Sequence, residues 1–309
     1  MVQWSRRQYP ADMQVHSWPA ADGWPLRSFG LPATGTIKGE ILFLGGRADF
    51  FEKYLEPFQI WRNAGWSVTG FDWRGQGGSG ELHAGKGCHI DDFAIFIDDL
   101  AAFSTDWCAR TAGPRVMIGH SMGAHVLLRA VAQGAVAPDA MVLLAPMLGI
   151  RLGPLRGRAM HRLATIGRTP VLNRRLIWTG QASPVQGHVT SCSERRQDKQ
   201  WWKAQRPDLA REGPSWGWLA AATRSIALLE RELRAVPSQV PGLMLVSPTD
   251  AVIDVAAIRR LSRLLPAVEL ALIGQAGHEL LRERDEPRMA CLAHIDRLLD
   301  RVAGQHAVP

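Results

Sequence analysis

Short apolar segments recur along the chain, and each ends in small or polar residues. Six of them share this pattern: 40–46, 66–73, 115–121, 141–146, 243–248 and 268–274. Near-continuous apolar runs of this length are typical of strands that are buried on both faces of a sheet. Two earlier segments, "MQVHSW" and "GWPLRSFG", are separated by a Gly/Asp-containing turn and predict an antiparallel hairpin.

Helical periodicity occupies the spaces between these strands, at 49–65, 90–108 and 121–134. Strands that alternate with helices predict parallel β-α-β units, and therefore an α/β fold with a mostly parallel central sheet flanked by helices. The alternation stops after Pro146 and resumes at Leu243. We therefore predict a core formed by 1–147 and 236–309, with 148–235 inserted as a helical cap.

One motif combines a hydroxyl group with two glycines at a predicted strand-to-helix junction. The segment "VMIGHSMGAH" places Ser121 between Gly119 and Gly123. A sharp turn of this kind holds a serine clear of the backbone, and glycines at the flanking positions relieve the crowding. The sequence therefore predicts Ser121 as a nucleophile; the alternative is a glycine-rich turn with a capping serine.

A serine hydroxyl needs a base, and the base needs a group that orients it. Asp250 follows the apolar run 243–248, and His278 follows the last such run. The carboxyl ends of parallel strands meet at one edge of a sheet, where sites gather. We therefore predict His278 as the base and Asp250 as its partner, with Asp254 as the competing acid.

Backbone N–H groups beside the serine would stabilise a developing oxyanion. Met122 N–H follows the nucleophile directly, and a second donor is expected from the loop after strand 40–44. We predict Arg47 N–H for this role, with Gly46 as the alternative. The glycine-rich segment 71–80 lacks the features of a phosphate-binding loop, and we interpret it as a tight loop that supports the site.

These motifs give the chain a family resemblance. The segments "LGGRADFFEKY", "FDWRGQGGSG", "GHSMGAH", "TDAVID" and "AGHELLRERDEPR" resemble the serine α/β-hydrolases of the monoglyceride lipase and bacterial lysophospholipase type. The resemblance spans about residues 40 to 290. It implies the α/β-hydrolase fold, a catalytic triad of Ser121, Asp250 and His278, and oxyanion donors at Arg47 and Met122. The chain departs from the family at Gly45-Gly46, at Asp49 and in "SPTD".

Charge and composition extend this description. The chain has 309 residues and a net charge of +7, and seven arginines but no acid lie between residues 151 and 190. Five tryptophans accompany them in the predicted cap: Trp178, Trp201, Trp202, Trp216 and Trp218. One hypothesis is an acyl pocket with a basic rim; the alternative is that the tryptophans form the core of the cap.

The scattered cysteines and the absence of an apolar leader predict a cytoplasmic protein without disulfides. The sequence predicts no cofactor, no metal, no nucleic acid and no obligate protein partner, with transient contact to an anionic membrane surface. The predicted function is hydrolysis of a carboxylic ester of a monoacyl lipid through an acyl-enzyme. The alternatives are another small acyl substrate, whether ester or thioester, an acyltransferase, or a non-catalytic binding protein of the same fold.

Overall fold

The computed structural model describes residues 5–151, 169, 171–179 and 189–306. An eight-stranded sheet lies at its centre, with the strand order β1-β2-β4-β3-β5-β6-β7-β8. The strands are β1 (Gln14–Pro19), β2 (Pro25–Leu31), β3 (Gly39–Leu44), β4 (Trp66–Phe71), β5 (Arg115–His120), β6 (Ala140–Leu144), β7 (Gly242–Val246) and β8 (Val268–Leu272).

The sheet is parallel from β4 to β8 and antiparallel at its other edge. β1 and β2 form the predicted hairpin, and β2 then pairs antiparallel with β4 through partners such as Phe29 and Gly70. All remaining pairs are parallel. The predicted fold class, a mostly parallel sheet of the α/β-hydrolase type, is confirmed.

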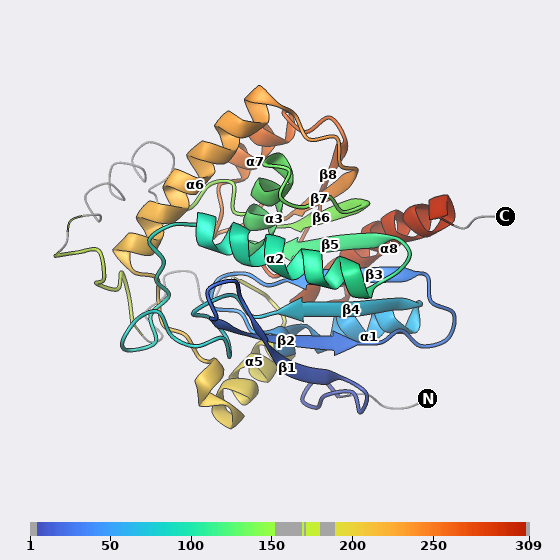
Figure 1. Ribbon diagram of the computed structural model, residues 1–309, viewed down its shortest axis with the longest axis horizontal. Helices are drawn as coiled ribbons and strands as arrows, with labels where there is room; N and C mark the ends of the chain where they lie inside the picture. Colours follow the sequence, from blue (N-terminus) through green and yellow to red (C-terminus); the bar gives the residue numbers. More distant parts are fainter. Residues whose placement is uncertain (1–4, 152–168, 170, 180–188, 307–309) are drawn as a thin grey trace.

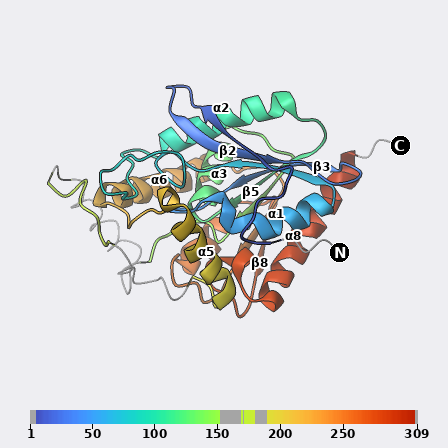
Figure 2. The same ribbon diagram turned by 90° about the horizontal axis from the view of Figure 1, so that it is seen from below.

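Helices cover both faces of the sheet. The α-helices are α1 (Leu55–Asn63), α2 (Ala94–Arg110), α3 (Met122–Ala132), α5 (Ser193–Gln205), α6 (Trp216–Ala235), α7 (Val255–Ser262) and α8 (Asp285–His306). The short 3-10 helices are η1 (Phe51–Tyr54), η3 (Pro207–Leu209) and η4 (Leu280–Arg282). Figure 2 shows α2 and α3 on one side of the sheet and α1 and α8 on the other.

Each face of the sheet packs into its own apolar cluster. Met117 of β5 lies in the cluster formed with α2, α3, α6 and α7, whereas Val116 and Ile118 lie in the cluster formed with α1 and α8. Successive side chains of a strand point to opposite faces. Because both faces are covered, the strand reads as a continuous apolar run and not as an alternating one.

Helices are present in all three predicted segments, but not all of them begin and end where predicted. The predicted helix 49–65 is divided into η1 and α1. The predicted helix 90–108 begins only at Ala94, whose N–H donates to the Asp92 side chain at 3.0 Å. Such a bond satisfies a backbone donor that the first turn leaves without an intrahelical partner. α7 and α8 lie outside the helices that the pattern predicts.

The segment predicted as a cap contributes α5, η3 and α6 between β6 and β7. In Figure 1 the arrow of β4 points away from both termini, toward the end of the molecule where α5 and the start of α6 lie. Part of the predicted cap, 152–168, 170 and 180–188, lies outside the described residues. The division into core and cap therefore stays a prediction.

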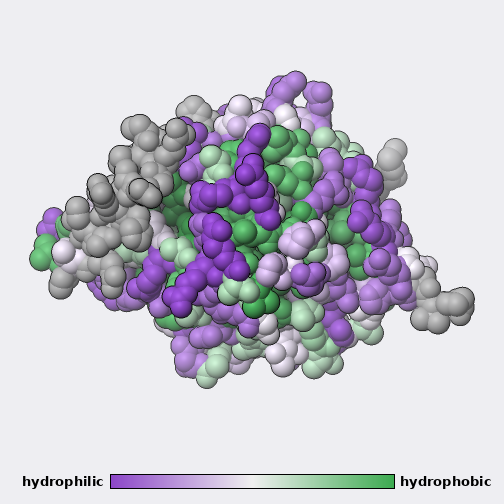
Figure 3. Space-filling model, turned by 90° about the horizontal axis from the view of Figure 1, so that it is seen from above, coloured by the Kyte–Doolittle hydropathy of each residue, from purple (hydrophilic) through white to green (hydrophobic). Residues whose placement is uncertain are grey.

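The surface mixes polar and apolar side chains. On the face seen in Figure 3, hydrophilic side chains run between the apolar areas. The large apolar side chains that are most exposed, Ile37, Val171 and Val236, come from different parts of the chain. Among the described helices, none has the length and apolar character that crossing a bilayer requires.

Candidate active site

Ser121 occupies a strained turn between β5 and α3. Its φ angle is 52°, a left-handed value that residues other than glycine rarely adopt. The turn is held from both sides, because Ser121 N–H donates to Leu144 O at 2.9 Å and Ser121 O accepts from Met147 N–H at 3.1 Å. Strain of this kind persists only where the surrounding structure imposes it.

The two flanking glycines are required by close backbone contacts. A Cβ on Gly119 would lie 2.6 Å from Ala124 Cα, and one on Gly123 would lie 2.4 Å from the carbonyl oxygens of Leu44 and Gly45. No side chain fits at such distances. The end of β3 and the start of α3 therefore approach each other as closely as their backbones allow.

Three predicted side chains form one hydrogen-bonded chain at the carboxyl ends of β5, β7 and β8. His278 Nε2 lies 2.9 Å from Ser121 Oγ, and His278 Nδ1 lies 2.8 Å from Asp250 Oδ2. A carboxylate only accepts, so Nδ1 carries the proton and Nε2 accepts from the serine hydroxyl. All three residues are buried.

The charges of Asp250 and His278 stabilise each other. Burial lowers the pKa of His278, but the charge and hydrogen bond of Asp250 outweigh it, and the pKa lies above its usual value. Burial likewise raises the pKa of Asp250, yet the charge of His278 and N–H bonds from Val252 and Ile253 hold it below its usual range. The carboxylate therefore stays ionised beside a histidine that accepts a proton readily.

Asp254, the competing acid, and His125, a second histidine close to Ser121 in the sequence, have other partners. The Asp254 side chain accepts from the N–H groups of Ala256 and Ala257 and is the N-cap of α7. His125 Nε2 lies 2.7 Å from Ser225 Oγ, and burial lowers the pKa of His125 to about 3. Asp254 therefore caps a helix, whereas Asp250 contacts His278.

The loop after β3 presents backbone N–H groups beside the serine. Gly46 N–H donates to Asp49 Oδ2 at 2.8 Å, and Ala48 N–H donates to Gln76 Oε1 at 2.5 Å. Within the described part of the chain, the N–H groups of Arg47 and Met122 have no hydrogen-bond acceptor. The geometry therefore favours Arg47 over Gly46 as a donor to a bound oxygen.

The glycine-rich segment 71–80 braces this loop. Trp73 Nε1 donates to Gly45 O at 2.7 Å, and Gln76 accepts from Ala48 on the other side of Arg47. Asp72 accepts from Phe51 N–H at 3.1 Å. These contacts agree with the interpretation of 71–80 as a supporting loop.

A buried polar network, which the sequence did not reveal, lies beside Ser121 and His278. Asp49 forms an ion pair with Lys53 and accepts from Tyr54 Oη at 2.7 Å. His120 Nδ1 lies 3.2 Å from Asp49, and His120 Nε2 lies 3.3 Å from the carbonyl oxygen of His278. His120 thus contacts the backbone of the neighbouring histidine. The sequence feature that could have indicated this contact is the position of His120 directly before Ser121.

Two cavities meet at Ser121. The larger, of about 180 Å³, has six cationic residues among its described walls: Arg47, Arg196, Lys199, Lys203, Arg211 and Arg282. The smaller, of about 70 Å³, is mostly apolar and is lined by Met147, Ile150, Ile177, Trp178, Trp218, Leu219 and Ile253 among others. Ser121, Arg47, Trp178 and Val252 line both cavities. A substrate with one apolar and one polar part would place its central bond near Ser121.

The described residues place part of the tryptophan and arginine set of the predicted cap at the cavities. Trp178 and Trp218 line the apolar cavity and flank the Arg47 guanidinium, whose carbon lies 5.7 and 5.5 Å from the two ring centroids. Trp202 instead packs into the core cluster on the α1 face of the sheet. Of the arginines in 151–190, Arg151 lines the apolar cavity, and four, at 156, 158, 162 and 168, lie outside the described residues.

Within the described residues, no group of three or more His, Cys, Asp or Glu side chains could hold a metal ion. The four cysteines, Cys88, Cys108, Cys192 and Cys291, are free thiols.

The fold and the serine turn define the class: the protein is a serine hydrolase of the α/β-hydrolase fold. A family profile described as "Serine aminopeptidase, S33" (Hydrolase_4) matches residues 35–285, and the chain belongs to this family. The predicted membership of the serine α/β-hydrolases is confirmed.

Two curated relatives are similar over most of the chain, and a solved structure has the same fold. The chain is 26% identical to a probable lysophospholipase L2 of Haemophilus influenzae over 269 residues, which cover 85% of this chain and 84% of the relative. It is 29% identical to lysophospholipase L2 of Escherichia coli K12, with 82% and 77% covered. A monoglyceride lipase structure from Saccharomyces cerevisiae, in complex with a substrate analog, superposes with a TM-score of 0.77 at 18% identity, covering 98% of this chain and 100% of that one.

Proposed function

We propose that this protein hydrolyses the carboxylic ester of a monoacyl lipid, a lysophospholipid or a monoacylglycerol, through an acyl-enzyme on Ser121. The observation that carries the proposal is the position of Ser121, hydrogen-bonded to His278 at the junction of an apolar and a polar cavity. The names of the similar proteins, lysophospholipase L2 and monoglyceride lipase, support the same substrate class.

Each step of the reaction has a group in position. His278 Nε2 takes the proton of Ser121 Oγ as the oxygen attacks the ester carbonyl, and Asp250 stabilises the imidazolium. The N–H groups of Arg47 and Met122 donate to the oxyanion. His278 then protonates the leaving alcohol, and a water that it activates releases the fatty acid and regenerates the serine.

The two cavities divide the substrate between them. The apolar cavity, with Ile177 and Leu219 among its walls, receives the start of the acyl chain. The polar cavity receives the glycerol and its head group. A mainly cationic wall disfavours the protonated amine of an aminopeptidase substrate, although the family description names one.

The test is covalent labelling of the serine. A fluorophosphonate probe should modify wild-type protein and the control Ser262→Ala, whose hydroxyl lies at the end of α7, but not Ser121→Ala. Peptide mass spectrometry should place the adduct on Ser121. A folded wild-type protein that resists the probe, or a Ser121→Ala protein that is labelled equally, would favour the non-catalytic binding alternative.

We further propose a cytoplasmic location, which the four free thiols support, and transient contact with anionic membrane surfaces, which the charge of +7 supports. Sedimentation with vesicles of phosphatidylglycerol, compared with phosphatidylcholine, tests the membrane contact. Equal sedimentation with both would contradict it.

A further inference from the structure

The polar cavity contains more positive charge than its own acids balance. Six cations line it, but only three carboxylates do, Asp49, Glu212 and Glu279. Asp49 forms an ion pair with Lys53, and Glu279 forms ion pairs with Lys53 and Arg282. The third acid, Glu212, is not free either. The carboxylates of the cavity are therefore occupied.

Three of the cations come from one face of α5. Arg196, Lys199, Gln200 and Lys203 all line the cavity, and their spacing of three, four and seven residues places them on one side of a helix. Their polar ends therefore converge on the cavity that also contains Ser121 and His278.

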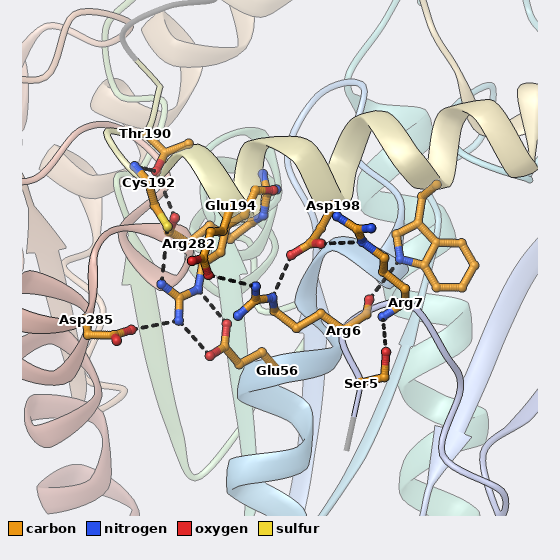
Figure 4. A network of polar contacts seen from close by, with 12 residues as sticks. Ser5, Arg6, Arg7, Glu56, Thr190, Cys192, Glu194, Asp198, Arg282 and Asp285 are labelled. Carbon is orange, nitrogen blue, oxygen red and sulfur yellow. Dashed lines mark hydrogen bonds and ion pairs between the residues drawn. The ribbon is translucent and has the colours of Figure 1, made fainter. Parts of the chain in front are cut away.

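A neighbouring face of α5, with Arg195, Asp198 and Trp202, is fixed to the rest of the protein. Arg6 Nε donates to Asp198 at 2.6 Å, Trp202 Nε1 donates to Arg6 O at 3.0 Å, and Arg195 Nε donates to Glu56 at 2.5 Å. Figure 4 shows Arg6 and Arg7 reaching Asp198 from the N-terminal segment. These contacts fix the rotation of the helix, so that the cations of the adjacent face point into the cavity.

Arg196, Lys199 and Lys203 have fewer counter-charges than their number requires. Glu279 Oε1 lies 3.9 Å from Lys199 Nζ, and the charge of Glu212 acts to raise the pKa of Lys203. Burial lowers the pKa of Lys199 to about 7, and the charge of Lys53 lowers it further. Burial and Lys53 also lower the pKa of Lys203. Partly buried cations in such surroundings are stabilised by an anion that enters beside them.

We propose that Arg196, Lys199 and Lys203 bind the phosphate of the substrate's head group. The preferred substrate is then a monoacyl glycerophospholipid and not a neutral monoacylglycerol. This proposal rests on the proposed function, because the phosphate is placed relative to an ester at Ser121. Phosphate oxygens match the donors, since guanidinium and ammonium groups form charge-assisted hydrogen bonds with them.

The test compares two substrates that differ in one group. We would measure kcat/KM for 1-decanoylglycerol and for 1-decanoylglycerol 3-phosphate, below the concentration at which either aggregates. The wild type should prefer the phosphate substrate by about tenfold or more, since one charge-assisted hydrogen bond is worth about that factor. Lys199→Met and Lys203→Met should each lower this ratio by about tenfold.

Two further variants separate charge from structure. Lys199→Arg keeps the charge and should retain the preference for phosphate. Lys38→Met removes an exposed lysine that pairs with Asp300 and directly precedes β3. It lies at the amino end of that strand, opposite the carboxyl ends where Ser121 lies, and should leave the ratio at the wild-type value. Thermal unfolding midpoints verify that each variant is folded.

Inorganic phosphate and glycerol 3-phosphate distinguish a head-group site from a site for free phosphate. Glycerol 3-phosphate should compete with the phosphate substrate more strongly than inorganic phosphate does. Equal competition would show a free-phosphate site and overturn the head-group assignment. So would a wild type that prefers the neutral substrate, or Met variants with an unchanged ratio, while ester hydrolysis at Ser121 would stand. Hydrolysis of neither substrate, without probe labelling, would instead overturn the proposed function.

Discussion

Replacing Gly123 by alanine tests whether the close approach of α3 to β3 sets the geometry of the site. The new Cβ would lie 2.4 Å from the carbonyl oxygens of Leu44 and Gly45, whereas ordinary contact begins at 3.4 Å. The two backbones must therefore separate by about 1 Å. The Ser121 turn lies on one side of this contact, and the loop that bears Arg47 lies on the other.

The effect on activity should exceed the effect on stability. A misplacement of about 1 Å costs on the order of 10²-fold in rate. Overpacking destabilises by about 1–3 kcal/mol, and the higher helix propensity of alanine offsets about 1 kcal/mol of this. A net loss of up to about 2 kcal/mol leaves a domain of ordinary stability folded. We therefore expect Gly123→Ala to be folded and at least about 100-fold less active.

The assays are kcat/KM on a short p-nitrophenyl ester and the urea midpoint of unfolding. The matched control is Gly304→Ala in α8, where an added Cβ meets no atom within 4 Å. It should keep full activity and gain up to about 1 kcal/mol. A folded Gly123→Ala protein with kcat/KM within threefold of the wild type would refute the reasoning, because the site would then tolerate the separation.

Three further predictions concern the acid, the base and the acyl cavity. Asp250→Asn should leave KM nearly unchanged and lower kcat by about 10⁴-fold, measured on the same ester, because the amide no longer holds Nδ1–H of His278. In the wild type, kcat/KM should rise with pH through a midpoint above 6.5, because His278 must be neutral to accept a proton and its pKa is raised; a profile from about pH 5 to 9 that is flat, or centred below 6.5, would contradict this. Ile177→Trp should narrow the apolar cavity and shift the preference among p-nitrophenyl esters toward shorter chains, while an unchanged chain-length profile would place the acyl group elsewhere.

The fold could be predicted well because its signal is local. Each of the six predicted parallel-sheet strands has its observed counterpart, beginning within one residue of the predicted start. Each hydrophobic run and each turn lies within one short segment of the sequence. The order of the strands in the sheet cannot be read from such segments, since β2 pairs with β4 across the chain segment that forms β3 and α1. Packing between segments that are distant in the sequence determines which strands are adjacent, and no short segment of the sequence contains this information.

The three side chains that we propose for the reaction follow from a similar local signal, and the structure brings them within hydrogen-bond distance. Ser121, Asp250 and His278 each follow an apolar strand, and the rule that carboxyl ends of parallel strands share an edge brings them together. The choice between Asp250 and Asp254 was harder, because both precede segments that could be helices. The structure distinguishes them by the N–H groups of α7, which the Asp254 side chain accepts.

The cations of the polar cavity could not be predicted in this way. The sequence of α5, "SERRQDKQWWKAQ", is charged nearly all round and resembles a solvent-exposed helix. Its two faces differ only because Asp198 and Trp202 meet Arg6 of the N-terminal segment. The excess of positive charge along the sequence lies instead in the arginines of 151–190. The density of charged residues along the sequence does not indicate which of them line the same cavity.

The residues that we propose for ester hydrolysis and the residues that we propose for head-group binding lie on different parts of the fold. The side chains around the reacting ester lie at the ends of β5, β7 and β8, where strand pairing and two close glycine contacts fix them. The cations that we assign to the head group lie on α5, whose rotation depends on side-chain contacts with Arg6 and Glu56. Exchanging residues on the cavity face of α5 leaves those contacts and the strand ends in place. A change of head group should therefore need only substitutions on one helical face, whereas a change of reaction would require the sheet itself to shift.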